Sequence, residues 1–105
     1  MAAVKLAQLD EIPDGGMICR DHGGLQVLLA RIGGAVYAMN NVCTHAGAPL
    51  AEGELGGEGR YLLTCPWHDA HFDVRTGAVQ QDTPWAFDTE VYPVELRGDE
   101  VWVEL

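Results

Sequence analysis

Cys43-Thr44-His45 and Cys65-Pro66-Trp67-His68 are separated by nineteen residues, and each of these two short segments offers one thiolate and one imidazole. A 2Fe-2S cluster with two cysteines on one iron and two histidines on the other needs this matched set of donors. Tetrahedral zinc is also satisfied by two cysteines and two histidines. Because the Cys-x-His spacing is less typical of structural zinc, the pattern favours an iron–sulfur centre and leaves zinc open.

The two motifs lie in a central region, about residues 40–83, that differs in composition from both flanks. This region contains a connection rich in glycine and glutamate, Glu52 to Gly59, and two expected short strands at 60–64 and 71–74. We expect a small cluster-binding subdomain here, inserted between the halves of a β framework. Residues Gly56–Gly59 would form a flexible hairpin tip.

The flanks are typical of short strands separated by turns, and no long helix is expected. The expected strands cover residues 4–9, 17–20, 25–32, 35–39, 90–97 and 100–105. Gly33-Gly34 and Gly98-Asp99 are hairpin turns, because glycine supplies the positive φ that such turns need. Apolar and polar residues alternate from 94 to 105, which indicates strands with one buried face. The sequence therefore predicts an all-β fold, an antiparallel sandwich or small barrel.

A chain of 105 residues, 48% of them hydrophobic, predicts one folded domain spanning residues 1–105. Sixteen acidic and six basic side chains give a net charge of −10, which disfavours nucleic acid and favours positively charged partners. No stretch is apolar enough to span a membrane, and Met1–Glu11 is not a secretory signal, so we expect a cytoplasmic protein. Cys19 has no second spare cysteine to pair with, and a buried, inert thiol is expected.

Extended to Cys43–Leu50 and Cys65–Gly77, the two motifs resemble the cluster-binding boxes of Rieske proteins, and most of all those of small Rieske-type ferredoxins of ring-hydroxylating dioxygenases. Leu9–Pro13 and Tyr92–Val94 agree as well, so the resemblance covers essentially the whole chain. It implies a Rieske-type antiparallel β fold and one 2Fe-2S cluster, with Cys43 and Cys65 on one iron and His45 and His68 on the other. His71 matches a position that is not a ligand, and a solvated side chain is expected there.

Two departures from one branch of this family concern the reduction potential. Rieske proteins of respiratory complexes carry a further cysteine in each loop, joined as a disulfide, where this chain has Ala48 or its neighbours and Trp67. They also place a serine after the second histidine, whereas Asp69-Ala70 offers no hydroxyl. Because hydrogen bonds to the cluster sulfurs stabilise the reduced state, their loss predicts a low-potential centre.

The resemblance implies a monomeric, soluble one-electron carrier that passes electrons from a flavoprotein reductase to a terminal oxygenase and is not itself an enzyme. The small subunit of an NAD(P)H-dependent nitrite reductase is one alternative, although such subunits often lack some of the ligands. A zinc-stabilised interaction module without redox function is the other. The spacer between the motifs is slightly longer than in dioxygenase ferredoxins, and the surplus at Gly56–Gly59 leaves the partner surface open.

Overall fold

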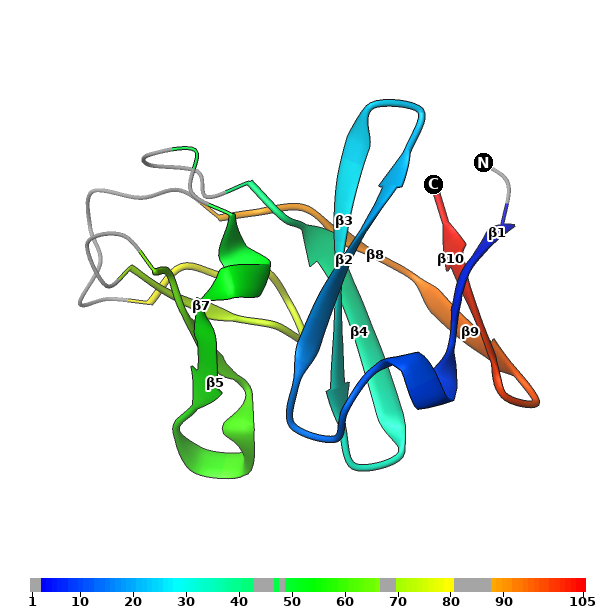
Figure 1. Ribbon diagram of the computed structural model, residues 1–105. Coiled ribbons are helices and arrows are strands. Elements are labelled where there is room, and N and C mark those ends of the chain that lie inside the picture. The colour runs from blue at the N-terminus through cyan, green and yellow to red at the C-terminus, as the bar shows by residue number, and fades with distance from the viewer. Residues whose placement is uncertain (1–2, 43–46, 48, 67–69, 81–87) are drawn as a thin grey trace.

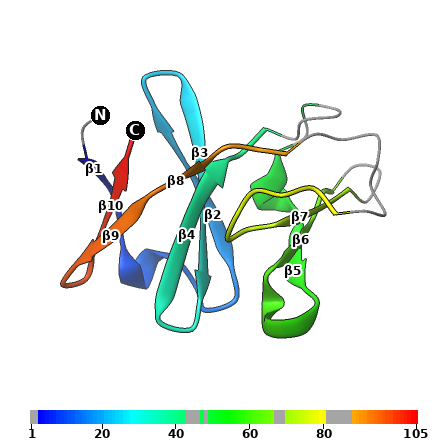
Figure 2. The same cartoon turned by 180° about the vertical axis from the view of Figure 1, so that it is seen from behind.

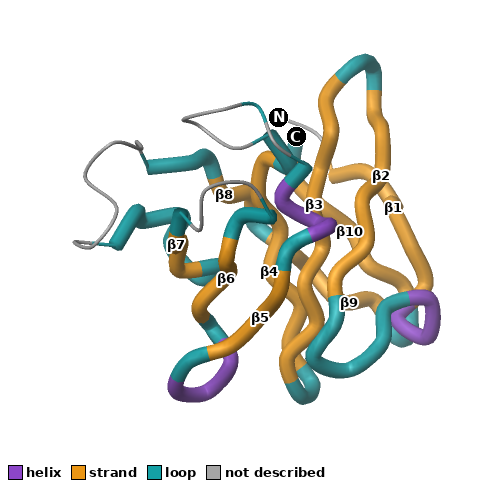
Figure 3. Tube along the Cα trace, turned by 60° about the vertical axis from the view of Figure 1, so that its left-hand side comes forward, coloured by secondary structure: helices purple, strands orange, loops and turns teal. Residues whose placement is uncertain are grey.

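The computed structural model describes residues 3–42, 47, 49–66, 70–80 and 88–105. Strands dominate this part of the chain, and its helical elements are short 3-10 turns at the ends of the sheets (Figure 3). The strands are β1 (Ala3–Gln8), β2 (Met17–His22), β3 (Leu25–Ile32), β4 (Ala35–Asn40), β5 (Glu54–Gly56), β6 (Leu62–Thr64), β7 (His71–Asp73), β8 (Val91–Tyr92), β9 (Val94–Arg97) and β10 (Glu100–Glu104). The 3-10 turns are η1 (Leu9–Glu11), η2 (Leu50–Glu52) and η3 (Glu58–Arg60).

The strands form antiparallel sheets that we call terminal, central and small. The terminal sheet has the order β1-β10-β9, the central sheet β2-β3-β4-β8 and the small sheet β5-β6-β7. The central sheet lies between the other two (Figures 1 and 2), and the first and last strands of the chain lie side by side because β1 pairs with β10. The expected all-β antiparallel fold is thus confirmed.

The central sheet is buried on both faces, which explains the unbroken apolar run in β3. Leu28 and Ala30 pack on the face toward the small sheet, and Val27 and Leu29 pack on the face toward the terminal sheet. A strand covered on both faces has no polar side to alternate with its apolar side. The side facing the small sheet carries the core that reaches the predicted metal ligands. We call this core the loop-side core; its fully buried members are Leu28, Ala30, Met39, Leu50, Leu63, Cys65, Ala70, Phe72 and Val74.

Local turn chemistry agrees with the expected hairpins. Gly33 and Gly98 both have a φ of 62°, in the left-handed region that glycine adopts most easily. The continuous strand expected over 90–97 is wrong, because Pro93 separates β8 from β9 and the two strands belong to different sheets. Proline has no N–H to donate to a ladder, so it marks the place where the chain leaves the central sheet.

The glycine-rich connection is more ordered than the sequence suggests. Residues 54–56 form β5, which pairs with β6 through Glu54–Thr64, Leu55–Leu63 and Gly56–Leu62. The hairpin reverses through Gly57, Gly59 and Arg60, all of which have positive φ. The hairpin expected at Gly56–Gly59 is therefore present, and the side chain of Arg60 reaches back to Gly15, in the turn before β2.

Within the described residues, no helix is long and apolar enough to cross a membrane.

Candidate metal centre

The second motif begins at the end of β6. Cys65 follows Thr64 directly, is fully buried, and donates its backbone N–H to the carbonyl oxygen of Ala70 at 2.7 Å. This hydrogen bond joins the described ends of the connection between β6 and β7. Pro66 is exposed, so the chain passes from the core to the surface within one residue of the predicted ligand.

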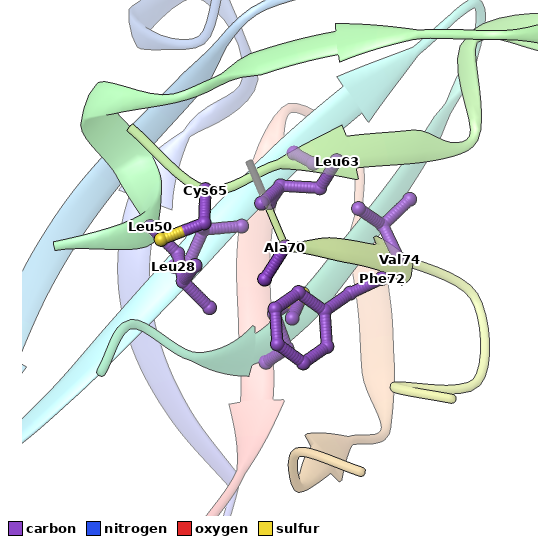
Figure 4. Packing of buried hydrophobic residues seen from close by; sticks show 9 residues of the cluster. Leu28, Leu50, Leu63, Cys65, Ala70, Phe72 and Val74 are labelled. Carbon is purple, nitrogen blue, oxygen red and sulfur yellow. The ribbon is translucent and has the colours of Figure 1, made fainter. Parts of the chain in front are cut away.

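The thiol of Cys65 lies in an apolar environment. Its sulfur points into the loop-side core beside Leu28 and Leu50 (Figure 4). Leu63 and Phe72 belong to the same core, so the structure keeps water from this side of the sulfur. A metal–thiolate bond at this position would be shielded on its protein side, and such shielding is one factor that sets the potential of an iron–sulfur centre.

The first motif is held on a closed stem. Val42 and Pro49 form an antiparallel bridge, and the N–H of Leu50 donates to the carbonyl of Asn41 at 2.7 Å. Asn41 itself is only 2% exposed, although it lies in a connection. Sequence reasoning missed this residue; the polar doublet Asn40-Asn41 between an apolar strand and a cysteine motif is the one signal for it.

Gly53 brings the first motif against the strand that carries the second. Its N–H donates to the carbonyl of Leu50 at 2.9 Å and ends η2. A Cβ placed on Gly53 would overlap the carbonyl oxygen of Thr64, the residue before Cys65. Leu50, at the end of the first motif, also packs in the loop-side core with Cys65, at the start of the second. The described ends of the two motifs therefore meet beside the contact between Gly53 and Thr64.

A further connection, with described ends at Gln80 and Asp88, is also anchored beside β7. The N–H of Val79 donates to Asp88 Oδ1 at 2.9 Å, and the N–H of Thr89 donates to the carbonyl of Gly77 at 2.9 Å. Gln80 donates its N–H to the carbonyl of His71 at 3.0 Å. His71 lies in β7 opposite Thr64 and is half-buried, rather than the fully solvated side chain that the sequence led us to expect.

An ion pair and two aromatic rings support the turn after β7. Arg75 donates from Nη2 to Asp73 Oδ2 at 2.8 Å and from Nε to Asp73 Oδ1 at 3.1 Å, which lowers the pKa of the Asp73 carboxyl. The guanidinium also lies 4.1 Å from the centre of the Tyr61 ring, which meets Tyr37 of β4 edge to face. Burial, followed by the hydrogen bond with Tyr61, raises the pKa of Tyr37. These contacts tie the small sheet to the central sheet.

Of the four predicted ligands, the structure places Cys65. Cys43, His45 and His68 lie outside the described residues, so the complete ligand set stays a prediction. In the part of the chain that the structure describes, no three His, Cys, Asp or Glu side chains gather as a metal site. The residues fit a 2Fe-2S cluster in two respects. The donor types match, and Cys65, the predicted ligand among the described residues, is a buried cysteine where the two motifs meet.

Cys19 differs from the buried thiol expected from the sequence. It lies in β2, the edge strand of the central sheet, and is only half-buried. Partial burial raises the pKa of this thiol, which favours the protonated, less reactive form. The raised pKa is consistent with the expected inert thiol, whereas the expected burial is wrong because Cys19 is only half-buried.

Comparison with known proteins identifies close relatives over almost the entire chain. Residues 2–93 match the model of the Rieske [2Fe-2S] domain. The ferredoxin component of the naphthalene 1,2-dioxygenase/salicylate 5-hydroxylase systems of Ralstonia sp is 35% identical over 97% of this chain and 94% of the relative. The ferredoxin component of biphenyl 2,3-dioxygenase from Rhodococcus jostii (strain RHA1) is 31% identical over 100% of this chain and 94% of the relative.

Solved structures agree with these relatives. The ferredoxin of carbazole 1,9a-dioxygenase from Nocardioides aromaticivorans IC177 superposes with a TM-score of 0.89 at 36% identity, covering 98% of this chain and 97% of that one. A chain from a complex of reduced oxygenase and oxidised ferredoxin in carbazole 1,9a-dioxygenase matches with a TM-score of 0.85 at 29% identity, over 96% and 91% of the two chains. An NADH-dependent nitrite reductase small subunit from Mycobacterium tuberculosis reaches 0.83 at 23% identity, over 97% and 93%, which shows the shared fold alone.

Proposed function

Because this chain belongs to the Rieske [2Fe-2S] domain family, we propose that it is a one-electron carrier serving a ring-hydroxylating oxygenase. It receives electrons from a flavoprotein reductase and passes them to the terminal oxygenase. The observation that carries the proposal is the near full-length similarity to ferredoxin components of dioxygenase systems, at 35% identity over 97% of the chain. The complex of an oxygenase with a related ferredoxin supports the oxygenase as the partner.

We assign the cluster ligands as Cys43 and Cys65 on one iron and His45 and His68 on the other. When bound, the cluster supplies one reversible electron at a potential set by ligand charge, hydrogen bonds to sulfur and exposure to water. The chain contributes a core that keeps water from the sulfur of Cys65, and a backbone that reaches the surface at Pro66. A short path from a buried ligand to the surface suits transfer to a partner that docks briefly.

Substrate chemistry would then belong to the oxygenase, and the chain would act in the cytoplasm as a monomer. Residues 1–105 would form one Rieske domain, with the cluster-binding subdomain at about residues 40–83. The small sheet and the described ends of both motifs fall within that range, which supports this division.

The function is tested by measuring the metal content, the reduction potential and the electron transfer of the purified protein. We expect a red-brown protein that holds iron and sulfide and has a potential at the low end of the Rieske range, about −150 mV. It should be reduced by a dioxygenase flavoprotein reductase and reoxidised by the terminal oxygenase from the same organism. A colourless protein with stoichiometric zinc would contradict the proposal, and turnover only with a nitrite reductase large subunit would reassign the partner.

Acidic side chains beside the candidate site should steer the reductase. Glu52 ends η2 and Glu54 begins β5, and both are exposed near the strand that leads into Cys65. In a chain of net charge −10, neutralising them as E52Q/E54Q should slow reduction at low salt by about 2- to 10-fold, and the difference should vanish at high salt. Stopped-flow absorbance over a salt series measures the rate.

The matched control for this charge change is E95Q/E104Q. Both glutamates are exposed and lie in the terminal sheet, on the far side of the central sheet from the small sheet (Figure 1). This variant removes the same charge and should leave the rate nearly unchanged. Equal slowing by the two double variants would show that total charge, rather than an acidic surface near the centre, governs the encounter.

A further inference from the structure

Asn41 is a buried polar residue two positions before Cys43, and its hydrogen-bonding groups all have partners. Its backbone N–H donates to the carbonyl of Gln26 at 3.0 Å, and its carbonyl accepts from Leu50 at 2.7 Å. Its side-chain Oδ1 accepts from the N–H of Ala51 at 2.8 Å, and its Nδ2 donates to Gln26 Oε1 at 3.1 Å. A side chain only 2% exposed thus makes two hydrogen bonds to segments far apart in sequence.

These contacts join the entrance and the exit of the first motif to the same strand. Gln26 lies in β3, and Ala51 lies in η2, immediately after the motif. The amide orientation is determined by Ala51, because a backbone N–H can only donate and so requires the oxygen of Asn41. Nδ2 must then face Gln26, whose Oε1 accepts from it. Both polar atoms of the Asn41 amide, Oδ1 and Nδ2, are therefore held by hydrogen bonds. We call the side-chain hydrogen bonds of Asn41 to Gln26 and Ala51 the clamp.

The position of η2 matters because η2 links the clamp to the second motif. Leu50, the first residue of η2, packs in the loop-side core with Cys65. A shift of η2 relative to β3 would change the distance between the stem of the first motif and the buried thiol. Val42 and Pro49, the next residues of the stem after Asn41 and before Leu50, form an antiparallel bridge, so the stem would move as a unit.

We propose that Asn41 is a positioning residue for the metal centre. Its side chain holds the stem of the first motif against β3 and so fixes, relative to Cys65, where the chain enters and leaves that motif. The proposal rests on the proposed function, since it assumes a cluster shared by the two motifs. Residues that orient metal ligands without touching the metal commonly affect how tightly the metal is held.

The test compares cluster release from Asn41→Leu, Asn41→Asp and the wild-type protein during challenge with an iron chelator. Leucine has the same branched shape and number of heavy atoms as asparagine but cannot accept from Ala51, so release should be about 10-fold faster or more. Aspartate keeps the accepting oxygen, and the amide of Gln26 can rotate to donate to its second oxygen, so release should stay within about 3-fold of wild type. The EPR signal of reduced Asn41→Leu should also broaden, because the ligand geometry becomes heterogeneous.

Val103→Ala is the control for loss of stability alone. Val103 is fully buried in β10, in the core between the central and terminal sheets and away from both motifs. Release and EPR line shape are compared after thermal unfolding has shown how much each variant is destabilised. If Val103→Ala and Asn41→Leu release the cluster equally fast at equal loss of stability, Asn41 is only a structural residue and the proposal is overturned.

Gln26→Ala keeps the proposal testable if Asn41→Leu does not fold. Gln26 is exposed, so its truncation removes the acceptor of Nδ2 without opening a cavity. We expect a smaller acceleration of release from Gln26→Ala alone, about 3-fold; where Asn41→Leu does fold, adding Gln26→Ala to it should have no further effect. Release from Gln26→Ala at the wild-type rate would by itself refute the clamp. A wild-type protein that holds no cluster would refute the proposed function instead, and the positioning role with it.

Discussion

A Cys65→Ala variant is expected to be purified colourless, with neither iron nor labile sulfide, whereas Cys19→Ala should hold a full cluster. Cys65 would supply one of the two thiolates on its iron, and no other described cysteine lies in the loop-side core to replace it. Iron and sulfide analysis together with visible absorbance measure the outcome. We expect cluster content to fall below about a tenth of wild type, since loss of a ligand costs at least as much as loss of a residue that orients one.

The Cys19→Ala control separates loss of a ligand from loss of a thiol. Cys19 is half-buried in the edge strand β2, and its raised pKa keeps it protonated, so its removal should leave the cluster and its potential unchanged. Circular dichroism should show strand content in both variants, because alanine at position 65 removes only one sulfur from the core. A coloured Cys65→Ala protein with wild-type iron content would remove Cys65 from the ligand set.

Much of the framework could be predicted from the sequence because its signals are local. The strand expected over 25–32 is β3 to the residue, since an apolar run between two glycine turns defines both of its ends. The split at Pro93 could have been predicted from the missing N–H of proline, but the alternation of apolar residues continues across it. β5 was missed because Glu54-Leu55-Gly56 has no strand propensity of its own and forms only by pairing with β6.

The candidate site shows the same division between local and long-range information. The two motifs are recognisable because cysteine and histidine at fixed spacing are rare outside metal sites. Asn41 could not be found in this way, because an asparagine in a connection is normally on the surface and its burial depends on Gln26 and Ala51. His71 was expected to be solvated, yet it is half-buried, and its backbone carbonyl accepts from the N–H of Gln80 in the connection that follows β7.

Gly53 is the clearest case of a residue whose importance depends on a distant contact. It has a φ of −80°, so its backbone conformation does not demand glycine. The requirement comes from Thr64, whose carbonyl oxygen occupies the space of a Cβ. At Gly56, the other end of β5, a Cβ would meet nothing within 4 Å beyond its chain neighbours. Gly53 directly precedes β5 and Gly56 ends it, so the same substitution to alanine can be compared at a crowded and an open position.

Gly53→Ala should lower the free energy of unfolding by about 3 kcal/mol, the upper part of the range for overpacking, because backbone at Thr64 cannot yield as a side chain would. For a chain of this size each kcal/mol corresponds to roughly 4–8 °C in Tm. Gly56→Ala should be neutral or stabilising by about 0.4–1 kcal/mol. Since Thr64 precedes Cys65, Gly53→Ala should also reduce cluster content, measured as iron per chain beside thermal unfolding followed by circular dichroism. If both variants unfold at the same temperature and retain equal iron, the contact between Gly53 and Thr64 does not hold the two motifs together.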